Sequence, residues 1–268
     1  MRQLMLGLLM CSALSSAVAG PFEDGAAAYE RGDYATALRL MRPMAEQGNA
    51  SAQLKLGLMY GLGQGVPQDY TKSAKWYLKA AEQGNASAQF NLGIRYDNGQ
   101  GVPQDYAMAM KWYRKAADQG YAPAQSSLGA MYGLGQGIPR DYHESLKWYR
   151  RAVEQGYAIA QTGLGVMYEN GRGVPQNYSE AAKWYRKSAD QGEATGQHNL
   201  ASMYYYGQGV SQDYVQAYKW LSLAAAGDTV AATDHQAKAL KNRDIIAKKM
   251  APAQIAEAER LAREWKPK

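Results

Sequence analysis

Five tryptophans lie at a constant spacing of 36 residues, at Trp76, Trp112, Trp148, Trp184 and Trp220. Two sets of tyrosines and one set of glycines keep the same spacing. They are Tyr60, Tyr96, Tyr132, Tyr168 and Tyr204; Tyr70, Tyr106, Tyr142, Tyr178 and Tyr214; and Gly65, Gly101, Gly137, Gly173 and Gly209. A period of this length is typical of solenoids, in which each repeat buries its apolar face against the next. The sequence therefore predicts a stack of similar units.

The first half of each unit predicts a helix, which we call helix A. In the unit that begins near Ala50, Ala52, Leu56, Gly57 and Tyr60 fall on one helical face. The segment 61–67 that follows holds three glycines and a proline, which end the helix and form a turn. Helix A therefore ends before this loop.

The second half of each unit predicts a second helix, helix B. Asp69 is placed to cap its N-terminus, the helix runs from about Tyr70 through Trp76 to Gln83, and Gly84 is suited to the left-handed C-terminal cap. We find no alternation of useful length that would predict a strand. The predicted fold class is all-α.

These residues resemble the Sel-one-like repeat family, which is related to tetratricopeptide repeats. The resemblance rests on a Leu-Gly-x-x-Tyr segment at 56–60, a Gly-x-Gly-Val-Pro-Gln-Asp-Tyr loop at 63–70, Ala-x-Trp-Tyr at 74–77 and a closing Gln-Gly at 83–84. It implies a right-handed superhelical solenoid of antiparallel helix hairpins. Such families scaffold many unrelated complexes, so the resemblance constrains function less than fold.

The pattern divides the chain into predicted parts. They are a signal peptide at 1–19, an N-terminal capping hairpin at 20–49, five repeats at 50–85, 86–121, 122–157, 158–193 and 194–229, and C-terminal capping helices at 230–268. Leu40 takes the tryptophan position in the N-terminal hairpin. Pro252 opens a last helix with an apolar stripe of Ile255, Ala258, Leu261, Ala262 and Trp265, which we expect to seal the last repeat.

The N-terminus resembles a secretory signal peptide. Arg2 precedes an apolar run, and Ala17-Val18-Ala19 predicts cleavage after Ala19. This run is shorter than the roughly 20 residues of a membrane span. Cys11, the only cysteine, lies inside it, and Met10 argues against a lipid anchor there. We expect a periplasmic or secreted protein without disulfides or membrane span.

Residues that recur in every repeat satisfy a demand that every repeat shares, which is packing. We therefore expect the tryptophans to be core residues, and a stacking platform for sugars or bases is the alternative. Gly57 and its equivalents cost about 1 kcal/mol each in a helix relative to alanine, which indicates close approach of helix B. Ala201 takes this position in the fifth repeat.

Basic residues form a ridge along the B helices. Lysines precede all five repeat tryptophans, and Lys79, Lys115, Arg151 and Lys187 follow four residues after the first four of these lysines. We expect Glu82, Asp118, Glu154 and Asp190 to pair with this second set of cations. The net charge is only +6 over 268 residues and acids are interspersed, so we expect no nucleic-acid partner.

Positions that vary between repeats are better candidates for recognition. In tetratricopeptide units the inner helices line a concave groove, and by similarity helix A supplies the groove-facing positions here. They are Leu54, Leu58, Leu62, Phe90, Ile94, Asn98, Ser126, Ala130, Leu134, Thr162, Val166, Asn170, His198, Ser202 and Tyr206, with Tyr205 beside them. We expect a peptide or helix of a protein partner to bind there, with Phe90 and Leu54 as apolar anchors, to a monomeric scaffold.

The sequence shows no convincing catalytic constellation. His143, His198 and His235 belong to no paired metal motif, so we expect no metal or cofactor. A repeated loop also argues against a unique active site, and we expect no enzymatic activity. Some cysteine-rich relatives are assigned β-lactam binding or hydrolysis, which stays an alternative although this chain lacks their cysteines. Binding to cell-wall glycan is the third possibility, hinted at by 21 tyrosines.

Overall fold

The computed structural model describes residues 20–226 and 234–268, and within these ranges the chain forms 14 helices. The predicted signal peptide, residues 1–19, and the boundary between the fifth repeat and the C-terminal cap at 227–233 lie outside the described residues. The helices are α1 Pro21–Glu30, α2 Tyr34–Glu46, α3 Ala50–Leu62, α4 Tyr70–Glu82, α5 Ala86–Asn98, α6 Tyr106–Asp118, α7 Ala122–Leu134, α8 Tyr142–Glu154, α9 Ala158–Asn170, α10 Tyr178–Asp190, α11 Ala194–Tyr206, α12 Tyr214–Ala225, α13 Asp234–Ala247 and α14 Pro252–Glu264.

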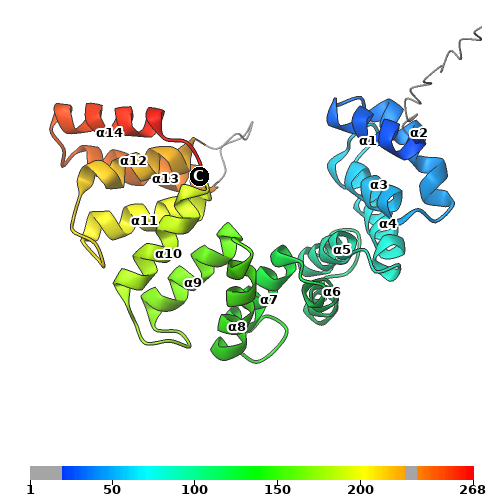
Figure 1. Ribbon diagram of the computed structural model, residues 1–268, viewed down its shortest axis with the longest axis horizontal. Coiled ribbons are helices and arrows are strands. Elements are labelled where there is room, and N and C mark those ends of the chain that lie inside the picture. The colour runs from blue at the N-terminus through cyan, green and yellow to red at the C-terminus, as the bar shows by residue number, and fades with distance from the viewer. Residues whose placement is uncertain (1–19, 227–233) are drawn as a thin grey trace, which may run out of the picture.

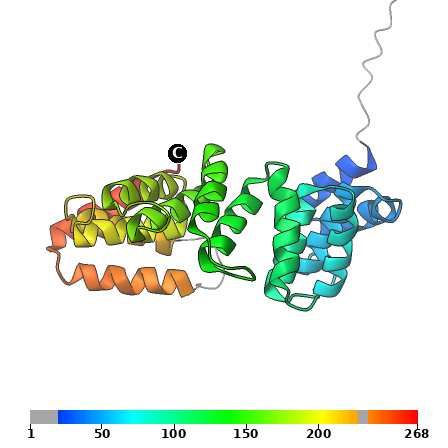
Figure 2. The ribbon, with the colours of Figure 1, turned by 90° about the horizontal axis from the view of Figure 1, so that it is seen from below.

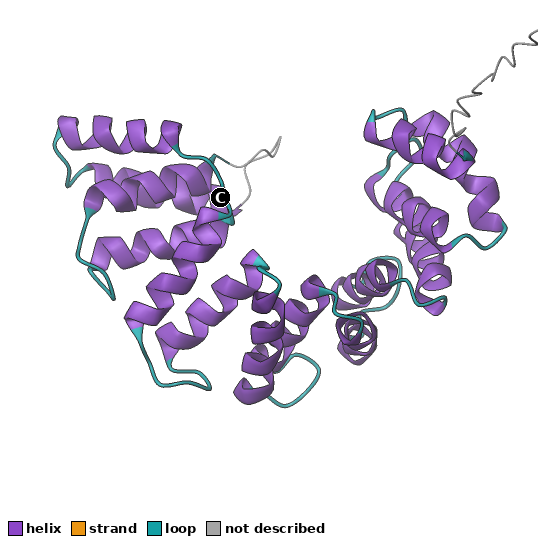
Figure 3. Ribbon diagram, viewed as in Figure 1, coloured by secondary structure: helices purple, strands orange, loops and turns teal. Residues whose placement is uncertain are grey.

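Consecutive helices pair as hairpins, and each hairpin packs on the next to form an open arc (Figure 1). The N-terminal hairpin α1–α2 and the C-terminal helix α14 lie on the two arms of this arc. From below, the hairpins stand side by side along the curve (Figure 2). The described residues form helices joined by loops, with no strand among them (Figure 3). The all-α solenoid predicted from the 36-residue period is confirmed.

Each B helix begins at a side-chain cap in the predicted register. The carboxylate of Asp69 accepts a hydrogen bond from the backbone N–H of Lys72 at 2.9 Å, and this contact satisfies one of the helix's free donors. Equivalent caps are Asp33, Asp105, Asp141, Asn177 and Asp213. Gly84, one residue beyond the C-cap of α4, has a φ of +88°, which the sequence predicted for this position.

The loop glycines lie so close to the preceding hairpin that a side chain would collide with it. Gly65 has a φ of +70°, and a Cβ atom there would lie 2.9 Å from the carbonyl oxygen of Tyr34 in the preceding hairpin. Gly101 stands in the same relation to Tyr70, where a Cβ atom would come still closer to the backbone. Each loop therefore touches the start of the previous helix B. This contact explains why the glycine recurs at every period.

The mid-helix glycines allow the close approach of helix B that the sequence predicted, and the residue that approaches is a tyrosine. A Cβ atom at Gly57 would lie 2.4 Å from the ring of Tyr77. The pairs Gly93–Tyr113, Gly129–Tyr149 and Gly165–Tyr185 repeat this contact. In the fifth repeat Leu221 replaces the tyrosine and Ala201 replaces the glycine. The methyl group of Ala201 is accommodated because its partner has no aromatic ring.

A relay of glutamines joins neighbouring hairpins through buried polar contacts. Gln89 is 4% exposed, and its Nε2 donates to the carbonyl oxygen of Ala81 at 3.0 Å. Its Oε1 in turn accepts from Gln119 Nε2 at 2.7 Å. Gln53 and Gln125 make the same pair of contacts in the adjoining repeats. The closing Gln-Gly of the motif thus ties each repeat to its own helix A and to the previous hairpin.

The tryptophans are packing residues rather than an open stacking platform. Trp112, Trp148 and Trp220 are 5%, 1% and 1% exposed, and each belongs to an apolar cluster that spans neighbouring helices. Trp76 and Trp184 are half-buried against the same type of cluster. The prediction that this ladder forms part of the core is confirmed for the three buried members.

The basic ridge has a different organisation from the one predicted. Lys79 lies 4.6 Å above the ring of Trp76, and the same contact links Lys115 to Trp112, Arg151 to Trp148 and Lys187 to Trp184 at 4.4–4.5 Å. Among the described residues these cations form no ion pair with Glu82, Asp118, Glu154 or Asp190. The predicted pairing was wrong because an indole face one helical turn away offers a cation–π contact.

The C-terminal helix covers the end of the stack, as its apolar stripe predicted. In α14, Ala258 is fully buried and Trp265 packs edge-on against Trp220 with ring centroids 6.1 Å apart. Ile255 and Trp265 contact the apolar cluster of the last repeat. Helix α13 lies against α12 as well. The final hairpin is thus shielded from solvent by two additional helices.

Candidate functional site: the inner face of the arc

The A helices α3, α5, α7, α9 and α11 form the inner face of the arc. Figure 1 shows α3 and α5 on the inner side, with α4 and α6 outside them. In the second half of the arc, α7 contacts α9 and α9 contacts α11 directly, across the intervening B helix. Such contacts between alternate helices are expected where a curved stack is compressed on its concave side. The inner face is therefore built from helix A, as the resemblance to tetratricopeptide units implied.

Most of the predicted groove residues are at least partly exposed. Leu62, Leu134 and Tyr206 are 59%, 58% and 67% exposed. Asn98 and Asn170 are also exposed, and the half-buried members are Leu54, Leu58, Phe90, Ile94, Ala130, Val166, His198, Ser202 and Tyr205. Large side chains that project at the ends of the A helices are thus the accessible part of the predicted set.

Two of the predicted groove residues are buried, which corrects that part of the prediction. Thr162 is 7% exposed because its hydroxyl bonds with Ser188 Oγ at 2.8 Å and donates to Glu193 Oε2 at 2.7 Å. Ser126 is 4% exposed. Its short side chain does not project beyond the contact between neighbouring hairpins. At the equivalent positions the longer side chains of Leu54, Phe90 and His198 are half-buried instead.

The two predicted anchors, Phe90 and Leu54, are partly packed against other residues of the protein. Phe90 lies 5.6 Å from the ring of Tyr113 and 5.4 Å from that of Tyr121, measured between centroids. Leu54 packs against the apolar cluster around Tyr77 and Leu92. These residues therefore support the junctions between hairpins, and Leu62 and Leu134 offer more free apolar surface to a partner.

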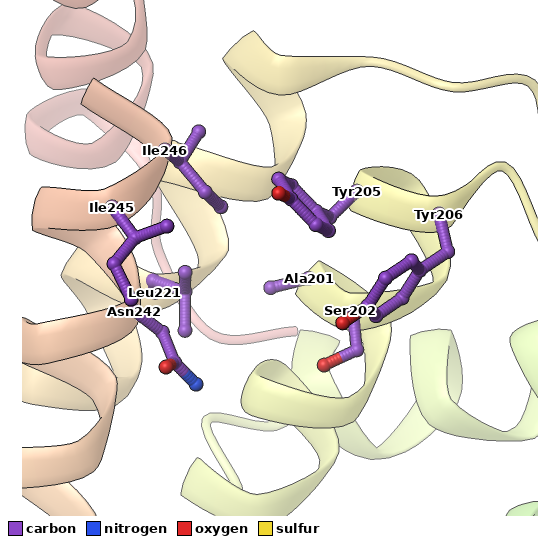
Figure 4. Close-up of a pocket in the computed structure, with 8 residues that line it drawn as sticks. All are labelled: Ala201, Ser202, Tyr205, Tyr206, Leu221, Asn242, Ile245 and Ile246. Atoms are coloured by element: carbon purple, nitrogen blue, oxygen red, sulfur yellow. The ribbon is translucent and has the colours of Figure 1, made fainter. Parts of the chain in front are cut away.

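A hollow of about 140 Å³ lies at the C-terminal end of the inner face, and Figure 4 shows its lining. It brings together three predicted residues, Ser202, Tyr205 and Tyr206 of α11. The other lining residues are Ala201, Leu221, Asn242, Ile245 and Ile246. The hollow lies beside the fifth repeat, where Leu221 stands in place of the tyrosine of the other repeats.

The polar groups of this C-terminal hollow are held by local contacts. Tyr205 and Tyr206 pack edge to face at 4.8 Å between centroids, and Lys249 Nζ donates to the hydroxyl of Tyr205 at 2.6 Å. That hydrogen bond raises the pKa of Lys249. His198 Nε2 lies 2.9 Å from Asn242 Nδ2. The hollow therefore presents fixed phenol and amide groups beside apolar walls.

Sequence reasoning missed the contribution of α13 to this hollow. Asn242, Ile245 and Ile246 belong to a helix beyond the point where the repeat register ends, so no equivalent position predicted which side they face. The available signal was the apolar pair Ile245-Ile246 in an otherwise polar segment. Only the docking of α13 against α12 brings them to the inner face.

A second hollow of about 270 Å³ opens between α7, α8 and α9. Four predicted groove residues line it: Ala130, Leu134, Thr162 and Val166. Its walls are mainly apolar, and Tyr149 of α8 contributes a phenol. The inner face thus holds two hollows near its middle and its C-terminal end, and both include variable positions of helix A.

The described residues include no group of three or more His, Cys, Asp or Glu side chains that could hold a metal ion. Within the same part of the chain, no helix is long and apolar enough to cross a bilayer. The hydroxyl, phenol, amide and apolar groups of the two hollows are suited to non-covalent recognition.

Comparisons with known proteins agree with the repeat architecture. The chain matches the Sel1 repeat over residues 21–49, 50–85, 86–121, 122–157, 158–193 and 194–228, so the N-terminal hairpin is matched as a shorter sixth repeat. None of the curated proteins matches. A Sel1 repeat protein from Oxalobacter formigenes is 32% identical, with 93% of this chain and 98% of that chain covered and a TM-score of 0.76.

Two more distant structures share the fold. A putative Sel1 repeat protein from Klebsiella pneumoniae subsp. pneumoniae is 21% identical, covers 77% of this chain and 97% of its own, and has a TM-score of 0.52. An immunity protein from Pseudomonas aeruginosa is 22% identical, covers 75% and 80%, and has a TM-score of 0.53. With six matched repeats that together span residues 21–228, this chain belongs to the Sel1 repeat family.

Proposed function

We propose that this protein is an exported, non-enzymatic scaffold that binds a peptide segment or helix of a partner protein along its inner face. The observation that carries the proposal is the row of exposed apolar side chains, Leu62, Leu134 and Tyr206, at equivalent positions of α3, α7 and α11. Large apolar side chains that converge on a concave surface are typical anchors for a bound segment. The two hollows supply recesses along the same face.

Export is part of this proposal and is supported by the signal-like sequence at 1–19. We expect the mature chain to begin at Gly20. N-terminal sequencing of the protein recovered from a periplasmic or secreted fraction tests this expectation. A chain recovered in the cytosol with its N-terminus intact would contradict it.

The decisive experiment is affinity capture from envelope extracts with the mature chain and a triple variant, Leu62→Ser, Leu134→Ser and Tyr206→Ser. These side chains are more than half exposed, so their replacement should leave the helical content unchanged. We expect the variant to lose the specific partner. A matched control, Leu240→Ser, replaces an exposed leucine of α13 outside the predicted groove and should retain it. Equal capture by the triple variant would contradict the proposal.

Two assays address the alternative functions directly. Hydrolysis of nitrocefin by the purified chain would revive the β-lactam hypothesis raised by cysteine-rich relatives. Sedimentation with purified peptidoglycan, abolished in the triple variant, would assign the groove to a glycan instead of a protein. We expect neither result.

A further inference from the structure

The hollow between α7, α8 and α9 collects residues that depart from the repeat pattern. Gly163 stands where the other repeats have Lys55, Asn91, Ser127 and Asn199, and Ile159 stands where they have Ser51, Ser87, Pro123 and Thr195. Arg172 stands where the other four repeats have glutamine. These three residues all belong to the fourth repeat and line the recess together with residues of the third. Since recurrent residues build the solenoid, a recess with three non-recurrent lining residues is a separate feature of this chain.

The missing side chain at Gly163 leaves room for the ring of Tyr149, which lines the recess. The ring of Tyr149 lies between the two helices α7 and α9, where a Cβ atom at Gly163 would be 2.5 Å from it and one at Gly129 would be 2.8 Å from it. The surrounding walls include Leu134 and Ile159, which are 58% and 53% exposed. The opening therefore has apolar walls and an aromatic ring at its base.

Tyr149 differs from its counterparts in the neighbouring repeats. Tyr113 donates to Asp97 and Tyr185 donates to Glu169, whereas glycine, Gly133, occupies the corresponding position for Tyr149. Among the described residues the hydroxyl of Tyr149 has no hydrogen-bond partner, although burial raises its pKa to about 12. Tyr149 is half-buried and lines the recess, so its hydroxyl is available to hydrogen-bond with a bound group.

Two charged side chains, Glu193 and Arg172, line the recess, and they differ in whether they already have partners. Glu193 is already satisfied: it accepts from Thr162 at 2.7 Å and from the backbone N–H groups of Thr195 and Gly196 at the start of α11. Arg172 stacks beside Tyr142 at 5.9 Å and forms no ion pair within the described part of the chain. Its guanidinium is thus the free charge at the recess, on a protein with a net charge of +6.

We propose that this recess binds an aromatic side chain of the partner segment, with a carboxylate beside that side chain held by Arg172. The proposal rests on the scaffold function proposed above and names the chemistry that the scaffold recognises. A cavity of roughly 150 Å³ accommodates benzene, so a volume of about 270 Å³ is sufficient for one phenol or indole ring. Arginine pairs with carboxylates through two parallel hydrogen bonds, which makes it a specific partner for such a group.

The test uses two small probes that differ only in the carboxylate, N-acetyl-5-fluoro-tryptophan and its amide, with binding to the mature chain followed by ¹⁹F NMR. We expect the acid to bind about tenfold more tightly than the amide, the effect of a charge-assisted contact. Arg172→Gln, which installs the residue of the other repeats, should abolish this difference. No binding of either probe, or no preference for the acid, would overturn the proposal.

A second variant tests the recess itself. Gly163→Asn installs the residue of the second and fifth repeats. It should weaken both probes at least about tenfold, because its Cβ atom would overlap the ring of Tyr149 and force this lining side chain to move. Ser127→Asn, the same change one repeat earlier and outside the recess, should leave binding unchanged. If Gly163→Asn keeps the helical content of the native chain and binds both probes normally, the recess is not the site.

Partner capture separates this proposal from the scaffold function. Arg172→Gln is expected to reduce capture of the partner that the triple groove variant loses. If Arg172→Gln captures the partner normally while the triple variant loses it, the recess is not the binding site of the partner. The proposed scaffold function would be unaffected by that result. Normal capture by both variants would overturn both.

Discussion

At the scale of single residues, the 36-residue period is maintained by complementary pairs rather than by isolated amino acids. A glycine in helix A and a tyrosine in helix B fit each other in four repeats, and Ala201 with Leu221 is the alternative pair in the fifth. The cost of a mid-helix glycine is offset by the burial of an aromatic ring against its backbone. The two positions should therefore be coupled energetically.

A double-mutant cycle at Gly57 and Tyr77 measures this coupling. Gly57→Ala should destabilise the protein by about 1–3 kcal/mol because the new methyl group overlaps a ring that is 1% exposed. In the presence of Tyr77→Leu, which reproduces the pair of the fifth repeat, the same alanine should cost less or stabilise helix A. Urea unfolding followed by circular dichroism checks the cycle, and strictly additive effects would contradict the packing argument.

The phenol of Tyr149 predicts a dependence of stability on alkaline pH. Burial raises its pKa from 10 to about 12, so the native state keeps a proton that the unfolded chain releases. The free energy of unfolding is therefore unaffected by this group below pH 10. It falls as the pH rises from 10 to 12, by up to about 2–3 kcal/mol. Tyr149→Phe should reduce the loss in that window. Identical pH profiles of unfolding for the two proteins would be evidence against a buried phenol.

At the scale of helices and hairpins, polar contacts fix how one repeat sits on the next. The N-caps define where each helix B begins. The buried glutamines form hydrogen bonds that join each hairpin to the preceding one. A buried amide that both donates and accepts is sensitive to position, so it specifies the alignment of hairpins more strictly than apolar contact does. The junctions should be weakened by loss of a single buried glutamine.

Gln89→Ala tests the contribution of this relay. The change removes the partners of the Ala81 carbonyl oxygen and of Gln119, and we expect a loss of about 1–3 kcal/mol. Gln119→Ala removes the exposed member of the same pair and should cost less. Hydrogen exchange should locate the effect at the junction of α4, α5 and α6. A uniform change along the chain, or equal costs for the two variants, would show that the relay does not act locally.

At the scale of the whole molecule, the described helices of the two arms lie apart across the arc, and each hairpin packs mainly on its neighbours (Figure 1). Stability in such a stack is approximately a sum of repeats and interfaces, and the terminal repeats need covers. Helix α14 provides one through Ala258 and Trp265, which bury the last repeat. Its removal should therefore act at one end only.

Deletion of residues 252–268 should loosen the C-terminal hairpin. The deletion exposes the apolar cluster around Trp220, and amide exchange in α11 and α12 should accelerate by about tenfold or more, ~1.4 kcal/mol of local stability. Exchange in α3 and α4 serves as the internal control and should stay unchanged because these helices lie at the other arm. Acceleration throughout the chain would contradict the nearest-neighbour description.

The sequence by itself determined the repeat unit. The spacing of Trp76 and its equivalents, the capping position of Asp69 and the stop at Gly84 predicted the hairpins and their limits, because these signals act within one or two helical turns. The apolar stripe of α14 predicted its capping role for the same reason. The family resemblance also implied that helix A faces inward, which the arc confirms.

Tertiary structure decided which variable residues are accessible and where the surface is hollow. Thr162 is buried because its hydroxyl forms hydrogen bonds with Ser188 and Glu193. The cations of the basic ridge contact indole faces instead of the nearby acids. Docking of α13 brought Ile245 and Asn242 to the inner face. Local sequence cannot specify these outcomes, since exposure and cavity shape depend on contacts between hairpins that are distant in the chain or outside the repeat register.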